Sequence, residues 1–152
     1  MMMPKKIAVA VAALAAAAGT LATAGPSVAA TPEPFVYTAS SSEAPPAALI
    51  GPNGEKPTAW GVAAVPVNSS KATVTPLASK SVGGGTWNYG TRNAGLDGTT
   101  CYSNYIHPSK KHSATAIKAG HTDKDTRSAD VWAKAAVTAG AAYTCYTYWG
   151  VY

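Results

Sequence analysis

The chain has 152 residues, carries a formal net charge of +5 and contains 14 glycines, 11 prolines and two cysteines. A net charge this modest makes nucleic acid a poor partner, and its positive sign favours anionic molecules at a cell surface. Only one run, near the amino end, approaches the length of a membrane span, so the product that follows it is expected to be soluble.

The first 30 residues have the three-part pattern of a secretory signal peptide. Residues 1–6 are basic, residues 7–24 form an alanine-rich apolar run, and small residues that suit a signal peptidase follow. Cleavage is expected after Ala30, with Ala24 as the alternative. A retained membrane anchor is the competing interpretation, but alanine is weakly hydrophobic and no basic stop-transfer flank follows. We therefore expect a secreted, extracellular protein.

Residues 31–82 are rich in proline, alanine and serine, and eight of the 11 prolines lie between Pro32 and Pro76. Such a segment cannot sustain a helix and has little to bury, so it predicts a disordered linker or pro-region. Trp60 and the apolar residues 62–67 are the exception and could dock transiently on the following domain. Whether the segment is removed during maturation stays open.

The compact domain is predicted to occupy residues 83–152, which hold both cysteines and three of the four tryptophans. Four strand-like runs are separated by turn signals: residues 86–91, 99–106, 113–118 and 143–149. In the last run Cys145, Thr147 and Trp149 share one face. Residues 125–140 are ambiguous, because their alanines favour a helix whereas their alternation fits a strand.

Cys101 and Cys145 allow only one intrachain pairing, and an exported chain meets an oxidising environment. A disulfide between them would close a loop of about 44 residues and stabilise the fold by about 4 kcal/mol in the chain-entropy model. It would connect the strand that contains Cys101 with the last strand of the domain.

Aromatic rings and positive charge share residues 102–115, which suggests a binding surface. The candidate ligand contacts are Tyr102, Tyr105, His107, Lys110, Lys111 and His112. A tight cationic turn can hold a pyrophosphate or a carboxylate group, although a solvated basic loop explains the same residues equally well. Three indoles, those of Trp87, Trp132 and Trp149, are expected to form the aromatic core rather than to line a groove.

The sequence lacks the patterns GxSxG and HExxH, and it has no glycine-rich phosphate loop. His121, Asp123 and Asp125 do not meet the ligand number of a metal site, so neither a metal nor another cofactor is expected. Gly83–Gly85 is interpreted as a flexible lead into the first strand of the domain. The protein is therefore expected to be non-catalytic.

Several short motifs from Gly84 to Trp149 resemble, in order and spacing, those of the lactococcin-972-like bacteriocins. The motifs are Gly85-Thr86-Trp87, Tyr102-Ser103-Asn104-Tyr105, His112-Ser113-Ala114-Thr115, Lys124-Asp125-Thr126 and Val131-Trp132-Ala133-Lys134-Ala135. The resemblance implies an all-β fold, a small β-sandwich of two antiparallel sheets. It therefore favours a strand around residues 131–137.

The resemblance also implies a function. It suggests a secreted antibacterial protein that binds the cell-wall precursor lipid II and blocks septum formation in related Gram-positive bacteria. A membrane protein and an ABC transporter that serve immunity or export are implied as partners. The alternative is a secreted inhibitor or wall-associated binding module without killing activity, and the oligomeric state, monomer or homodimer, stays open. The cysteine pair and the long segment before residue 83 depart from the family pattern.

Overall fold

The computed structural model describes residues 35–39, 43–65 and 78–152, which belong to one compact unit of the chain. The expected signal peptide, residues 1–30, lies outside the described residues. The elements are β1 (Phe35–Ala39), η1 (Ala47–Leu49), β2 (Ala59–Val65), β3 (Ala78–Val82), β4 (Gly85–Asn93), η2 (Gly95–Asp97), β5 (Thr99–Ile106), β6 (His112–Lys118), β7 (His121–Arg127), β8 (Ala133–Ala139) and β9 (Cys145–Val151). No helix among these elements is long and apolar enough to cross a membrane.

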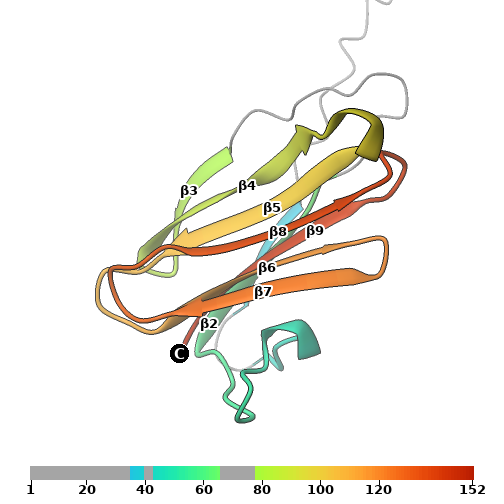
Figure 1. The fold of residues 1–152 in the computed structure, drawn as a ribbon. Coiled ribbons are helices and arrows are strands. Elements are labelled where there is room, and N and C mark those ends of the chain that lie inside the picture. The colour runs from blue at the N-terminus through green and yellow to red at the C-terminus, as the bar shows by residue number, and fades with distance from the viewer. Residues whose placement is uncertain (1–34, 40–42, 66–77) are drawn as a thin grey trace, which may run out of the picture. The chain divides into compact units, whose positions relative to one another are not determined.

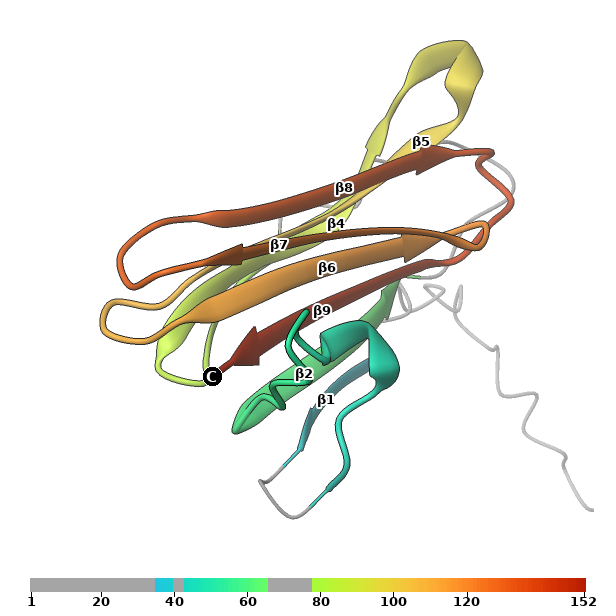
Figure 2. The same cartoon turned by 60° about the horizontal axis from the view of Figure 1, so that its bottom comes forward.

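The strands form two antiparallel sheets, which confirms the predicted all-β class and its two-sheet arrangement (Figure 1). One sheet has the order β1-β2-β9-β6-β7, and the other has the order β3-β4-β5-β8. Strands β5 and β8 of the second sheet lie against β6 and β9 of the first, so the core lies between the two layers. A view turned by 60° shows η1 on the outer side of the first sheet (Figure 2).

Alternation along the strands explains how so small a chain builds a core. In β8 the side chains of Ala133, Ala135 and Val137 are buried, whereas those between them are exposed. Within the ambiguous residues 125–140, this pattern makes Ala133–Ala139 a strand, because period two buries one face of a sheet. Residues 128–132 form the turn before it, so the strand expected around residues 131–137 begins at Ala133. Trp132 is the exception to the predicted aromatic core: it is only partly buried, since the alternation that turns Ala133 inward turns its neighbour outward.

Large rings and small alanines share the core between the sheets. Trp87 stacks on Tyr89 with ring centroids 4.0 Å apart, and Tyr105 stacks on Trp149 at 5.2 Å. All four rings are fully buried and face alanines of both sheets, such as Ala114. Aromatic side chains bury large areas, so they supply the apolar surface that leucine and phenylalanine supply elsewhere.

The predicted disulfide is present and links the two sheets. Cys101 lies on β5 and Cys145 on β9, with Cα atoms 5.4 Å apart and a sequence separation of 44. Both residues are fully buried in the core. The bond therefore joins one central strand of each layer and should stabilise the fold by about 4 kcal/mol.

Part of the segment predicted to be disordered is ordered and contributes to the fold. Residues 59–65 form β2, which pairs with β9 along its whole length and places Ala63 and Val65 in the core. On the other face of β2, Trp60 is 6% exposed and packs with Leu49 of η1. Prolines in the described part of residues 31–82 lie outside the strands, so they punctuate the β-structure instead of abolishing it.

Candidate functional site

The basic turn, residues 107–111, connects β5 to β6 and is organised around a buried histidine. His107 is 5% exposed, and its Nδ1 accepts hydrogen bonds from the backbone N–H groups of Ser109 at 3.1 Å and Lys110 at 3.0 Å. Burial and the neighbouring Lys110 charge lower the pKa of His107, although a hydrogen bond with the Gly83 backbone opposes the shift. The neutral ring therefore holds the turn, because a nitrogen that accepts two hydrogen bonds cannot carry a proton.

The second histidine of the turn region also has a positioning role. His112 is fully buried, its Nδ1 lies 2.8 Å from the Lys110 carbonyl oxygen, and its Nε2 lies 2.7 Å from the Val131 carbonyl oxygen. Its ring meets the Tyr105 ring edge-on, with centroids 5.6 Å apart. The residue thus ties the basic turn to the loop before β8 and presents no free nitrogen to a ligand.

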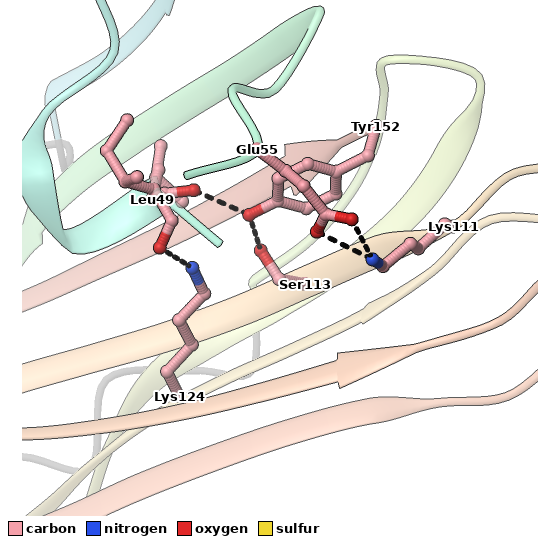
Figure 3. Close-up of polar contacts among 7 residues, drawn as sticks. Leu49, Glu55, Lys111, Ser113, Lys124 and Tyr152 are labelled. Carbon is pink, nitrogen blue, oxygen red and sulfur yellow. Dashed lines mark hydrogen bonds and ion pairs between the residues drawn. The ribbon is translucent and has the colours of Figure 1, made fainter. Parts of the chain in front are cut away.

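The two lysines of the basic turn are exposed, but their surroundings differ. Lys110 forms no ion pair with any described residue, whereas the Lys111 ammonium contacts both Glu55 carboxylate oxygens, at 2.8 and 2.6 Å (Figure 3). Glu55 comes from the segment between η1 and β2, 56 residues earlier in the chain. Of the two cations chosen from the sequence, Lys110 therefore has no ion pair within the described part of the chain, whereas Lys111 is bound to a carboxylate.

A group of donors that the sequence analysis missed surrounds Lys111. The Tyr152 ring has the ammonium groups of Lys111 and Lys124 each 5.8 Å from its centroid. Its hydroxyl donates a 2.6 Å hydrogen bond to the Leu49 carbonyl oxygen and lies 3.1 Å from the Ser113 hydroxyl. We call Lys111, Ser113, Lys124 and Tyr152 the cationic cluster. It lies on the outer face of the five-stranded sheet, because Ala114 of β6 is in the core and its neighbour Ser113 points the other way. Figure 3 shows the contacts of the cluster.

Strand pairing explains why these residues meet. The backbone N–H of Tyr152 donates to the Lys111 carbonyl oxygen at 2.9 Å, which extends the β6–β9 ladder by one step. Lys124 on β7 pairs with Thr115 on β6, and alternation turns its side chain to the same outer face as Ser113. The outward alternation of the last strand, which continues to Tyr152, was the available signal for this cluster.

The tyrosines predicted to contact a ligand lie apart from the lysines. Tyr105 is fully buried and donates a 2.9 Å hydrogen bond to the Val82 carbonyl oxygen, and burial raises its pKa. Tyr102 faces outward from the other sheet, where the Arg92 guanidinium lies 6.0 Å from its ring centroid. Burial also raises the pKa of Tyr102, partly offset by the Arg92 charge. The fold therefore separates the predicted aromatic and cationic contacts.

An open pocket lies beside the basic turn. It is lined by the β3–β4 hairpin turn and by Ile106, Pro108 and Asp130. Gly83 and Gly84 have φ angles of 59° and 83°, which suit glycine, so the residues predicted to be a flexible lead form a tight turn. A Cβ at Gly84 would lie 3.0 Å from the His107 Nε2, which shows how closely the turn and the histidine pack.

Two acidic side chains of β7 bind the edge of the other sheet. Asp125 Oδ2 accepts the backbone N–H of Lys134 at 3.0 Å, and Asp123 Oδ2 accepts that of Ala136 at 2.9 Å. These bonds connect the edge strands β7 and β8 of the two sheets, where unpaired N–H groups would otherwise face solvent. Within the described residues, no group of three histidine, cysteine or acidic side chains could hold a metal ion.

Residues 83–149 match the Lactococcin_972 family of bacteriocins. No curated protein and no solved structure matches the chain. The resemblance drawn from the sequence is thereby confirmed over nearly the same residues, and the match supports an antibacterial, bacteriocin role.

The Lactococcin_972 match divides the fold unevenly. Strands β4 to β8 and most of β9 lie inside residues 83–149, together with the basic turn and Lys124. The ordered elements β1, η1, β2 and β3 lie outside it, as do Glu55 and Tyr152. The cationic cluster is thus built mainly by the bacteriocin-like region, residues 83–149, and is contacted by a segment that the family match does not include.

Proposed function

We propose that the protein is a secreted bacteriocin that binds an anionic cell-wall precursor, with lipid II as the first candidate, and blocks wall synthesis at the septum of related Gram-positive bacteria. The match of residues 83–149 to a bacteriocin family is the observation that supports this proposal most directly. The proposal involves binding only and assigns no catalytic residue. A membrane immunity protein and an ABC transporter are its expected partners in the producing cell.

The chemistry of the basic turn supports an anionic ligand. Lys110 and Lys111 follow each other in a turn whose backbone is fixed by His107. Both ammonium groups are therefore carried by the same short segment. Lysine acts as a compact point charge for phosphate groups. In the proposal, Lys110 makes the first contact with a pyrophosphate, because its ammonium is exposed and forms no ion pair with a described residue.

The pocket beside the turn supports a ligand that has more than one chemical part. Its wall combines the apolar side chains of Val82, Ile106 and Pro108 with glycine backbone. A precursor with a charged group next to a sugar or a lipid could place the charged group on the turn and a less polar part in this pocket. His107 and His112 enter the proposal as residues that position the turn.

The test is a titration of the purified full-length protein against lipid II in vesicles, together with growth and septation of sensitive cells. We expect saturable binding that weakens at least about tenfold in the Lys110→Ala/Lys111→Ala variant, since charge-assisted hydrogen bonds are the strong ones. The matched control is Lys80→Ala/Lys134→Ala, which removes the same charge from exposed positions outside the turn.

The two assays separate the proposal from its alternative. Binding together with arrest of septation supports a bacteriocin, whereas binding without any effect on growth indicates a wall-associated module. Equal binding by the two double variants would remove the basic turn from the proposal. Absence of binding to lipid II vesicles, compared with vesicles of the same lipids alone, would contradict the choice of ligand.

A further inference from the structure

The η1 segment, residues 43–58, supplies oxygen acceptors to three donors of the cationic cluster. The Lys111 ammonium donates to the Glu55 carboxylate, the Lys124 ammonium donates to the Ile50 carbonyl oxygen at 2.8 Å, and the Tyr152 hydroxyl donates to the Leu49 carbonyl oxygen. Three donors from three separate parts of the domain therefore converge on one short stretch of acceptors (Figure 3). Such a donor set is complementary to a phosphate or carboxylate ligand.

A tight turn places the acceptors of the η1 segment together. The Gly51 backbone N–H donates to the Glu55 carbonyl oxygen at 2.8 Å, and Gly54, with φ 77°, donates to the Gly51 carbonyl oxygen at 3.0 Å. A Cβ at Gly51 would lie 2.7 Å from a Glu55 carboxylate oxygen, so a glycine there makes room for the carboxylate. The turn thus brings Glu55 back to Gly51 and presents the Glu55 charge to Lys111.

The contact that holds the η1 segment is weaker than the core of the domain. Its buried apolar residues are Leu49 and Pro57, and the side chains of Lys111 and Glu55 are 43% and 37% exposed. Exposed ion pairs contribute little to stability and are screened by salt. Strand β2 differs, because it pairs with β9 and supplies core residues. The η1 segment can therefore leave the cluster while β2 stays in the sheet.

We infer that the cationic cluster is an anion-binding site and that the η1 segment is its internal, displaceable occupant. The ligand class is a pyrophosphate or a carboxylate, whose oxygens replace the Glu55 carboxylate and the two carbonyl groups. Access to the site then depends on release of the η1 segment, and removal of the Glu55 charge favours that release. The inference extends the proposed function, since Lys111 belongs to both the basic turn and the cluster.

The test uses the full-length protein and inorganic pyrophosphate, with binding followed by the amide chemical shifts of Lys111 and Lys124. Glu55→Gln removes one negative charge and keeps the shape of the side chain, and Asp97→Asn, in the exposed η2 turn, removes the same charge elsewhere. We expect pyrophosphate to bind Glu55→Gln at least threefold more tightly than Asp97→Asn. Adding Lys124→Ala to Glu55→Gln should abolish the gain, whereas adding Lys134→Ala should retain it.

Hydrogen exchange provides the second measurement. The amides of Gly51 and Gly54 should exchange faster at saturating pyrophosphate, while those of β2 stay protected, because only the η1 segment leaves. Equal affinity of Glu55→Gln and Asp97→Asn, or binding without faster exchange in residues 49–55, would overturn the inference. Binding of pyrophosphate is measured without bacteria. A protein that binds pyrophosphate as expected but does not kill would therefore support the inference and contradict the proposed function.

Discussion

The bacteriocin-like region and the η1 segment lie in one compact unit, yet different forces hold them. Residues 83–149 are held by stacked rings between two sheets and by a disulfide that joins the layers. The η1 segment lies on an outer face and depends on Leu49, on an exposed ion pair and on hydrogen bonds to side chains. The difference indicates a firmly held domain with a more weakly attached cover.

The division between the firmly held core and the η1 segment does not coincide with the boundary of the family match, because strand β2 belongs to the core. This strand lies outside residues 83–149, but Ala63 and Val65 belong to the core and Trp60 supports the η1 segment from below. The fold therefore extends beyond the matched residues, before residue 83 with β2 and after residue 149 with the end of β9. The distinction between core and cover falls near Thr58, whose backbone N–H and hydroxyl both donate to the Val151 carbonyl oxygen.

The largest expected effect on stability comes from the disulfide in the core of the domain. Replacement of both Cys101 and Cys145 by alanine should lower the free energy of unfolding by about 4 kcal/mol, because the open chain gains loop entropy when it unfolds. Urea denaturation of the full-length variant measures the change. Reduction of the wild-type protein should give a loss of similar size, and an unchanged midpoint in both cases would show that the disulfide does not hold the layers together.

A smaller loss should follow when the support of the η1 segment is removed. Trp60→Ala should cost about 3 kcal/mol, the lower end for a buried tryptophan, since the indole packs on Leu49, Val62 and Tyr148 at an outer face. Urea denaturation gives the loss, and hydrogen exchange should rise in residues 47–58 before it rises in β4 or β5. Tyr146→Ala is the matched control, because its ring is 43% exposed on the same face.

Local patterns predicted the core but not the cover. The run of residues 99–106 is observed as β5 with the same bounds, and the two cysteines left one pairing to consider. The contact of Lys111 with Glu55 spans 56 positions, and no local pattern specifies it. The proline-rich composition also hid β2, because composition averages over a segment whereas seven residues suffice for a strand. The burial of His107 and His112 could not be predicted either, because it depends on strands that are distant in the sequence.

The smallest expected effect is on the pH dependence of stability through His107 in the basic turn. It shows whether the turn is fixed by a buried residue or is held weakly, like the η1 segment. The pKa of His107 is lowered by burial and by the Lys110 charge, so the unfolded chain binds the His107 proton more readily than the folded protein does. Stability linked to this residue is therefore fully present above the ordinary histidine pKa of about 6.5 and is lost as the pH falls through the lower folded value. Protonation also removes the acceptor for the Ser109 and Lys110 amides.

The variant His107→Asn separates this effect from other titrations. The asparagine carbonyl oxygen can occupy the place of Nδ1 and accept hydrogen bonds without binding a proton in this pH range. Thermal unfolding from pH 7.5 to pH 5 should therefore show a smaller decline for His107→Asn than for the wild-type protein. Protection of the amides of residues 109 and 110 against hydrogen exchange, relative to the intrinsic rate at each pH, should fall on acidification only in the wild type. Parallel declines of the two proteins would mean that the backbone of the turn is fixed without His107, and that the lysines owe their placement to His112 and the sheet instead.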